Sequence, residues 1–311
     1  MQTYPDFETY YKEQVEPHLP EIHAQHDDVN NWGIAAMVTG SFCVFFLFAL
    51  MSGHFQHLGW SSLTIGIIFT IFSIYKYTAN KDQYDAAFKN KIIAGIFNFL
   101  HPGLTYLPDE KVPSNFYKAS SLFRNRHVYY DGSDFVSGVY KGVNFQCSDI
   151  HAQSENHKGN TSTVFKGLFF VADVNPFYTG GTYIWPKADE QLPTSLADEQ
   201  YRLYPMPPVY KITIGDIESE KKYSVYSTDP YDGGAVLQHG ILSALNEFSD
   251  TIGREVRLSI VAGKCYVSIA IEEDLFESTK DPANPEAVKQ YFFSALLILS
   301  IINQLKLNML Q

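Results

Sequence analysis

Two uncharged apolar runs near the N-terminus constrain the fold of this chain more than any other feature. The first, Trp32 to Ser52, reads WGIAAMVTGSFCVFFLFALMS, and the second, Leu58 to Tyr75, reads LGWSSLTIGIIFTIFSIY. About 20 apolar residues in a helix cross the roughly 30 Å hydrocarbon core of a bilayer. Because only Gly53 to His57 separates the runs, we expect a tight antiparallel transmembrane hairpin over residues 32–76, with helices at 32–52 and 58–75.

The alternative is a buried helical hairpin inside a water-soluble core. Nothing else in the chain offers enough apolar surface to cover two such helices. The first run is not a signal peptide either, because it starts too late, follows an acidic segment and lacks a basic lead. A lipid bilayer is therefore the expected surrounding of both runs, and Trp32, Trp60 and Tyr75 lie at their ends, where amphipathic rings prefer to sit.

The distribution of lysine predicts the orientation of the hairpin. The loop between the two runs has no Lys or Arg, whereas Lys76, Lys81, Lys89 and Lys91 follow the second run closely. Segments rich in Lys and Arg stay on the cytoplasmic side. Both termini and the soluble part of the chain are therefore expected in the cytoplasm, with the short loop outside.

Composition excludes some classes of partner and cofactor. The chain of 311 residues carries a formal net charge of −11, which argues against a nucleic-acid partner, since that needs a concentrated basic surface. The three cysteines include no C-x-x-C pair, so neither a zinc knuckle nor a redox motif is expected. We expect no metal and no cofactor.

The remaining residues predict an α+β fold in three parts. Residues 1–31 form an N-terminal cytoplasmic segment, whose amphipathic helix (Phe7, Tyr11, Val15) should end at Pro17 and Pro20. Residues 77–110 form a juxtamembrane helix and turn. Residues 111–311 form the soluble domain.

The soluble domain combines alternating apolar patterns with two helical ones, which indicates a mostly antiparallel sheet with packed helices. Thr163 to Val174 is apolar on both faces from Gly167 onward, as in a central strand. Residues 187–208 are expected to be an irregular loop. Other strands are expected at 135–140, 143–153, 181–185, 211–214, 223–226, 256–260 and 265–271, and helices at 235–248 and 285–307, the second capped by Asn284.

Several separate blocks of sequence resemble a known family. They are IIAGIFNFLHPGLTYLP (Ile92 to Pro108), SSLF (Ser120 to Phe123), TVFKGLFFVADVN (Thr163 to Asn175), KYSVYSTD (Lys222 to Asp229) and INQLKLN (Ile302 to Asn308). In this order, over roughly residues 80 to 308, they resemble the bacterial membrane-protein family known as domain of unknown function 3137.

The resemblance implies a protein of the bacterial inner membrane with two spans and one cytoplasmic domain, and no established activity. It also implies a membrane-protein partner of the LemA type, because such proteins accompany the family. One departure concerns an anionic ligand: where the family tends to place Arg after VYSTD, this chain has Gly234. If that Arg binds an anion in relatives, this chain has lost the contact.

Motifs for catalysis are few. The sequence has no phosphate loop, no dinucleotide-binding glycine pattern, no H-E-x-x-H and no G-x-S-x-G. Cys147, Asp149 and His151 alternate along one expected strand and would share a face. A thiol, a carboxylate and an imidazole are the groups of a thiol enzyme or hydrolase. Neighbouring side chains on one strand face are about 7 Å apart, which is too far for direct proton transfer. The same pattern is also explained by a strand whose buried face becomes polar at one end.

Two further residues are candidates for binding. Asp229 precedes an expected helix and His239 lies within it. An Asp at a helix start is usually a turn or cap residue.

The anchor, the lack of catalytic motifs and the aromatic-rich strands together favour a membrane-tethered binding or scaffold module. Its α+β domain would present a surface to a protein or lipid headgroup at the inner membrane. A membrane-bound hydrolase or thiol enzyme using Cys147, Asp149 and His151 is the alternative. A small-ligand sensor that signals through the helix after Tyr75 is a third reading.

Overall fold

The computed structural model divides the chain into two compact units. One comprises Met1–Gly95 and Glu277–Gln290, and the other comprises Ile96–Phe276 and Tyr291–Gln311. The structure describes residues 6–52, 56–123, 128–156, 158–174, 178–188, 209–238, 240–278, 284–307 and 310. Most of the irregular loop expected at 187–208 and the candidate residue His239 therefore lie outside the described residues.

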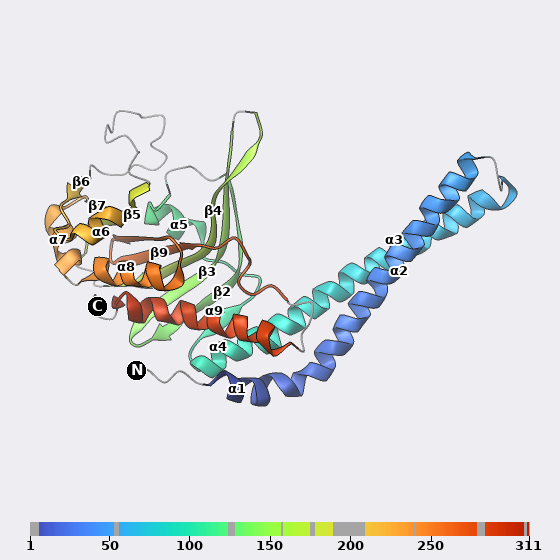
Figure 1. The fold of residues 1–311 in the computed structure, drawn as a ribbon, viewed down its shortest axis with the longest axis horizontal. Helices are drawn as coiled ribbons and strands as arrows, with labels where there is room; N and C mark the ends of the chain where they lie inside the picture. Colours follow the sequence, from blue (N-terminus) through green and yellow to red (C-terminus); the bar gives the residue numbers. More distant parts are fainter. Residues whose placement is uncertain are drawn as a thin grey trace. The chain divides into compact units, whose positions relative to one another are not determined.

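The first unit is built on two long antiparallel helices, α2 (Leu19–Met51) and α3 (Gln56–Phe88), which pack against each other along their length (Figure 1). Each has 33 residues and is therefore about 50 Å long at about 1.5 Å per residue. Glycines bring the two helices close: a Cβ added at Gly66 would lie 2.8 Å from Cys43 Sγ, and one at Gly33 would lie 3.3 Å from the Tyr77 ring. The predicted helical hairpin is confirmed.

The N-terminal segment forms a short helix that docks on the end of α3. It comprises α1 (Phe7–Tyr10), the π-helical turn η1 (Tyr11–Val15) and the 3₁₀ turn η2 (Glu16–His18). The fully buried Tyr10 hydroxyl donates a 2.6 Å hydrogen bond to the Ile92 carbonyl, which lies in a second π-helical turn, η3 (Lys89–Ile93). The expected helix end at Pro17 and Pro20 was wrong, because Pro20 lies in the first turn of α2, where its missing N–H costs nothing.

Residues beyond η3 lead into the second unit, whose centre is an antiparallel sheet of nine strands. The order is β1-β2-β3-β4-β9-β8-β5-β7-β6. The bounds are β1 Thr105–Leu107, β2 Tyr129–Tyr140, β3 Val143–Glu155, β4 Thr161–Asp173, β5 Gly181–Pro186, β6 Tyr210–Ile212, β7 Tyr223–Ser227, β8 Val256–Val261 and β9 Lys264–Ala270.

Helices cover both faces of this sheet (Figure 1). α5 (Ser114–Ser120) packs Tyr117 on one face, against Ile150, Phe165 and Phe169. α8 (Ile241–Ile252) and the part of α9 (Pro285–Gln304) from Tyr291 onward lie on the other face. The remaining helices are α4 (Ala94–Leu100), α6 (Ile217–Lys222) and α7 (Pro230–Gln238).

The α+β class and the predicted central strand are confirmed. β4 lies inside the sheet between β3 and β9, and it is buried on both faces from Gly167 to Ala172. Two tight hairpin tips have positive φ, at Lys141 and Gly142 between β2 and β3 and at Ala262 and Gly263 between β8 and β9. The single helix expected at 235–248 was wrong: Gly240, at φ +70°, ends α7 and begins α8.

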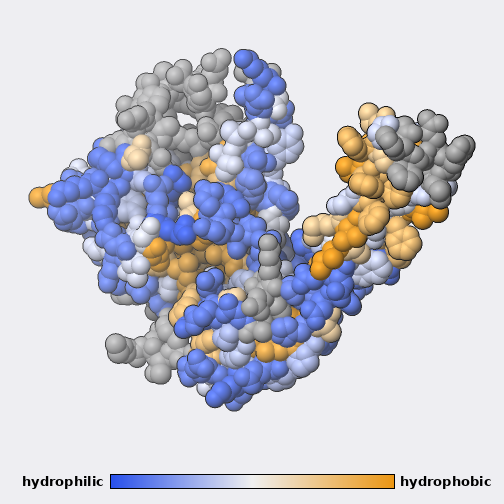
Figure 2. All heavy atoms as spheres, turned by 45° about the vertical axis from the view of Figure 1, so that its right-hand side comes forward, coloured by the Kyte–Doolittle hydropathy of each residue, from blue (hydrophilic) through white to orange (hydrophobic). Residues whose placement is uncertain are grey.

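Three helices among the described residues are long and apolar enough to cross a membrane by length and composition. They are the helical stretches Phe7–Met51 and Trp60–Leu100, and α9. α9 differs from the other two because Phe292, Ala295, Ile298 and Leu299 are buried in the protein. Many apolar side chains of α2 and α3 are exposed instead, and Figure 2 shows hydrophobic residues on the surface of the two long helices.

Candidate functional site

Cys147 and Asp149 lie on the buried part of one face of β3, as the alternation predicted, and His151 follows at its more exposed end. Cys147 is fully buried and pairs across the strands with Val136 and Phe170. Burial raises the pKa of its thiol far above the usual range. A thiol kept protonated in an apolar site is a poor nucleophile, because the thiolate is the reactive form.

His151 is more exposed than Cys147 and Asp149. Its Nε2 atom lies 3.2 Å from the Thr163 hydroxyl on the neighbouring strand β4. Among the described residues no hydrogen bond joins Cys147, Asp149 and His151, so the structure brings the three onto one strand without assembling them into a proton-transfer chain.

Asp149 has the most unusual surroundings of the three. The residue is 6% exposed, its Oδ2 atom accepts a 3.3 Å hydrogen bond from the Leu275 amide, and its Oδ1 atom has no hydrogen-bond partner among the described residues. The pKa of this carboxyl is raised to about 6, chiefly by burial and also by the carboxylates of Asp274 and Asp134. The hydrogen bond from the Leu275 amide and the ammonium of Lys166 lower the pKa and only partly offset this.

A second buried carboxylate lies on the neighbouring strand. Asp134 is in a β-bulge of β2 at φ +61°, and it accepts hydrogen bonds from Tyr106, at 2.5 Å, and Ser133, at 3.0 Å. These contacts satisfy Asp134, and the sequence gives no sign of them, because Tyr106 lies 28 residues away.

Asp229 has a structural role at the start of α7. Its Oδ1 atom accepts a 2.8 Å hydrogen bond from the Tyr231 amide, as a helix cap does. The neighbouring Asp232 accepts a 3.2 Å hydrogen bond from the Gly180 amide and fastens α7 to β5. At Gly234 an added Cβ would meet nothing within 4 Å, so a longer side chain would fit at this position.

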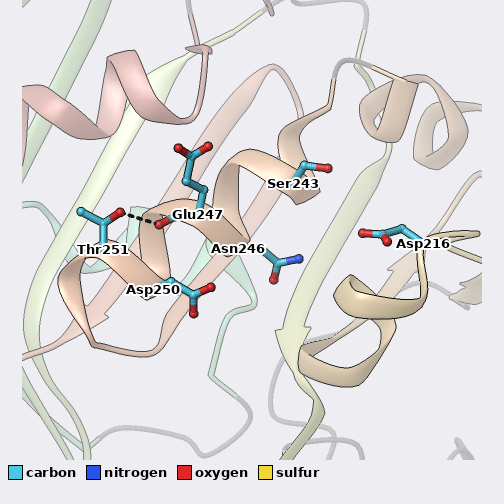
Figure 3. Close-up of a pocket in the computed structure, with 6 residues that line it drawn as sticks. All are labelled: Asp216, Ser243, Asn246, Glu247, Asp250 and Thr251. Atoms are coloured by element: carbon cyan, nitrogen blue, oxygen red, sulfur yellow. Dashed lines mark hydrogen bonds between the residues drawn. The ribbon is translucent and has the colours of Figure 1, made fainter.

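The structure adds one polar hollow that the sequence did not suggest. It has a volume of about 530 Å³ and lies between α8 and the start of α6 (Figure 3). Asp216 faces Ser243 and Asn246 across it, and Glu247, Asp250 and Thr251 complete the lining. Asp216 caps α6 through the Ser219 amide and hydroxyl, and Asn246 donates to the same hydroxyl.

This hollow has no catalytic pair. Its side chains are acidic or neutral, and its hydrogen bonds serve to cap α6 and join it to α8. The spacing Asp216-x-x-Ser219 is a recognisable cap signal, but its partner Asn246 is distant in sequence. Nowhere in the described part of the chain do three or more His, Cys, Asp or Glu side chains form a group able to hold a metal ion.

Comparison with protein families gives a direct result for the second unit. Residues 163–307 match the family described as protein of unknown function, DUF3137. The resemblance seen in the sequence is thereby confirmed for this span. No curated protein and no solved structure matches the chain.

The DUF3137 span runs from the first residues of β4 to the end of α9. It contains Lys166, Asp229 and the polar hollow, whereas Cys147, Asp149 and His151 precede it. The α2–α3 hairpin also precedes it, so the family match says nothing about the membrane.

Proposed function

We propose that this protein is a membrane-anchored binding or scaffold module of the bacterial inner membrane, with its α+β domain in the cytoplasm. The observation that carries the proposal is the outward-facing apolar surface of α2 and α3. Phe45, Phe48 and Met51 on α2 and Ile65 and Phe69 on α3 are exposed. Exposing such a continuous apolar surface to water is unfavourable. In a bilayer the same side chains contact lipid hydrocarbon chains, and the helical backbone satisfies its own hydrogen bonds.

The dimensions of the apolar surface support this placement. The apolar part of α2 from Gly33 to Met51 is about 28 Å long at about 1.5 Å per residue, close to the roughly 30 Å of a hydrocarbon core. Lys76 follows the apolar part of α3 directly, and its ammonium lies 5.9 Å from the Phe72 ring centroid. Lysines on this side favour a cytoplasmic domain.

Labelling of single cysteines tests the orientation. Ser52→Cys is exposed at the loop end of α2, and Thr78→Cys is exposed at the opposite end of the hairpin. A membrane-impermeant maleimide is expected to label Ser52→Cys in intact cells and Thr78→Cys only after permeabilisation. Cys147 and Cys265 are buried and contribute little background, and Cys43→Ser removes the third thiol. The reverse pattern would place the domain outside.

The partner is proposed to be another membrane protein, for which the family resemblance favours the LemA type. Native mass spectrometry of the full-length protein, gently extracted from its own membranes, tests this. A stoichiometric co-purifying membrane protein supports the scaffold function and identifies the partner. A lone chain, or one carrying only a bound small molecule, contradicts it and favours a ligand sensor.

The thiol-enzyme alternative predicts a different result for Cys147. Cys147→Ser is expected to leave the cellular phenotype of the intact gene unchanged, because the buried thiol is protonated and packs as an apolar side chain. The substitution is expected to lower the free energy of unfolding by about 1–2 kcal/mol, because it buries a hydroxyl group at an apolar site. Cys147→Ala is the matched control. Loss of the phenotype in both variants, with folded protein at normal levels by circular dichroism and blotting, would support the thiol enzyme.

A further inference from the structure

The segment that follows β9 contacts the middle of strands β4 and β3, and we call its residues 271–276 the strap. Its first residue donates a hydrogen bond from the Ile271 amide to the Lys166 carbonyl on β4, at 3.1 Å. Its last, Phe276, is buried, and its ring centroid lies 5.5 Å from that of Phe97 and 6.2 Å from that of Tyr106. The strap is thus fixed at both ends by ordinary packing and backbone bonding.

The middle of the strap is held differently. Asp274 pairs with Lys166 at 3.1 Å, and Glu273 pairs with Arg254 at 3.5 Å, both partly in solvent. Such exposed ion pairs contribute little. The remaining contact is the Leu275 amide, which donates to the carboxyl of Asp149.

This contact places the strap over a carboxyl group that water barely reaches. Asp149 is nine-tenths buried, and one of its oxygens has no hydrogen-bond partner in the part of the chain that the structure describes. The charged groups that act on it are Asp274 on the strap, Asp134 on β2 and Lys166 on β4. The Leu275 amide and the Lys166 ammonium favour a negative charge at Asp149, but burial, the largest effect, and the two carboxylates outweigh them while the strap is closed.

We propose that the strap is a proton-operated latch: a proton on Asp149 keeps residues 273–275 closed over the sheet, and loss of that proton lets them open. Opening gives the Asp149 carboxylate access to water and moves Asp274 away from it. Ile271 and Phe276 remain anchored, so the sheet itself is unchanged.

The direction of the pH dependence follows from linkage. When the strap is closed, the pKa of Asp149 is about 6. When the strap is open, water reaches the carboxyl and its pKa returns towards the ordinary value of about 3.9. Between these values the closed form binds more protons, so closure is most favourable at low pH and is weakened as pH rises to about 6. Above that the opening constant levels off, having risen by roughly a hundredfold.

Hydrogen exchange measured by mass spectrometry on the full-length protein in nanodiscs tests the latch. Peptides covering 271–276 are compared with peptides from β4 between pH 4.5 and 7.5, after correction for the intrinsic exchange rate. Protection of the strap is expected to fall by roughly 25-fold across this range, the rest of the change lying below pH 4.5, whereas that of β4 stays constant. A strap whose protection is constant over the same range would overturn the proposal.

Variants identify the group responsible. Asp149→Asn keeps an oxygen to accept the Leu275 amide but cannot ionise, so the strap is expected to stay protected at every pH. Asp274→Asn removes a like charge and is expected to lower the pH midpoint of opening. Glu273→Gln, on the same strap but not among the charges that act on Asp149, is expected to leave the midpoint unchanged. An unaltered midpoint in Asp274→Asn, or the wild-type pH dependence in Asp149→Asn, would contradict the latch.

Discussion

Replacing Phe42 and Ile68 together with arginine is expected to abolish retention of the protein in the membrane. The two side chains are 59% and 61% exposed near the middle of the apolar parts of α2 and α3. Each arginine at the centre of a membrane helix costs about 2.5–3.5 kcal/mol of insertion free energy, so the pair costs about 5–7 kcal/mol. On a helix in water the same changes are close to neutral. The measurement is the fraction of protein that remains in membranes after alkaline carbonate extraction.

Two matched variants make the result specific. Tyr231→Arg, at an 89% exposed position on α7 outside all three apolar helices, is expected to leave retention unchanged. Phe293→Arg, 55% exposed on α9, tests the third of these helices. Because α9 buries one side in the protein, we expect Phe293→Arg to be retained as well. Full retention of Phe42→Arg/Ile68→Arg would rule out the transmembrane hairpin.

Gly167→Ala is expected to be strongly destabilising, although it adds only one methyl group to the second unit. A Cβ at this position would lie 2.3 Å from the Ile269 carbonyl oxygen and 2.5 Å from the Ile271 amide nitrogen. Both atoms belong to the backbone, so they give way only if β4 and β9 separate. Gly167 also has φ +136°, a conformation that side chains rarely adopt. Together these effects are expected to cost about 4 kcal/mol.

Thermal unfolding followed by circular dichroism measures this cost, with Gly142→Ala as the control. Gly142 is also at positive φ, at +82°, but a Cβ there meets nothing within 4 Å. Its substitution isolates the backbone strain and is expected to cost about 1–2 kcal/mol. For a domain of this size about 1 kcal/mol shifts the melting temperature by roughly 2–4 °C, so the two variants should be well separated. Equal melting temperatures would contradict the steric argument.

The elements that the sequence predicted well are those with a strong local signal. The uncharged runs of α2 and α3, the continuous apolar run of β4 and the alternation in β9 needed no long-range information. The helices proved longer than their apolar runs because residues 19–31 and 76–88 contain no strong stop signal once Pro20 is placed in a first turn. Helices α5 and α6 have seven and six residues, too short for a periodic pattern to indicate.

The long-range arrangement was beyond reach of the sequence. β5 lies between β7 and β8, and β4 pairs with β9 about a hundred residues later. The surroundings of Asp149 have the same origin, because Asp134, Lys166 and Leu275 come from three different parts of the chain. Spacing along β3 indicated Asp149 as a candidate, but the partners that set its chemistry are brought together only by the fold.

The division of the chain into two units has a consequence for biosynthesis. The first unit contains the N-terminal hairpin and also residues 277–290, which are made only after the whole nine-stranded sheet. A chain that leaves the ribosome N-terminus first therefore produces its hairpin early and completes the unit around it near the end of translation. A premature stop before residue 277 removes a piece of the helical unit, and a single cut after Gly95 separates residues 277–290 from the rest of that unit.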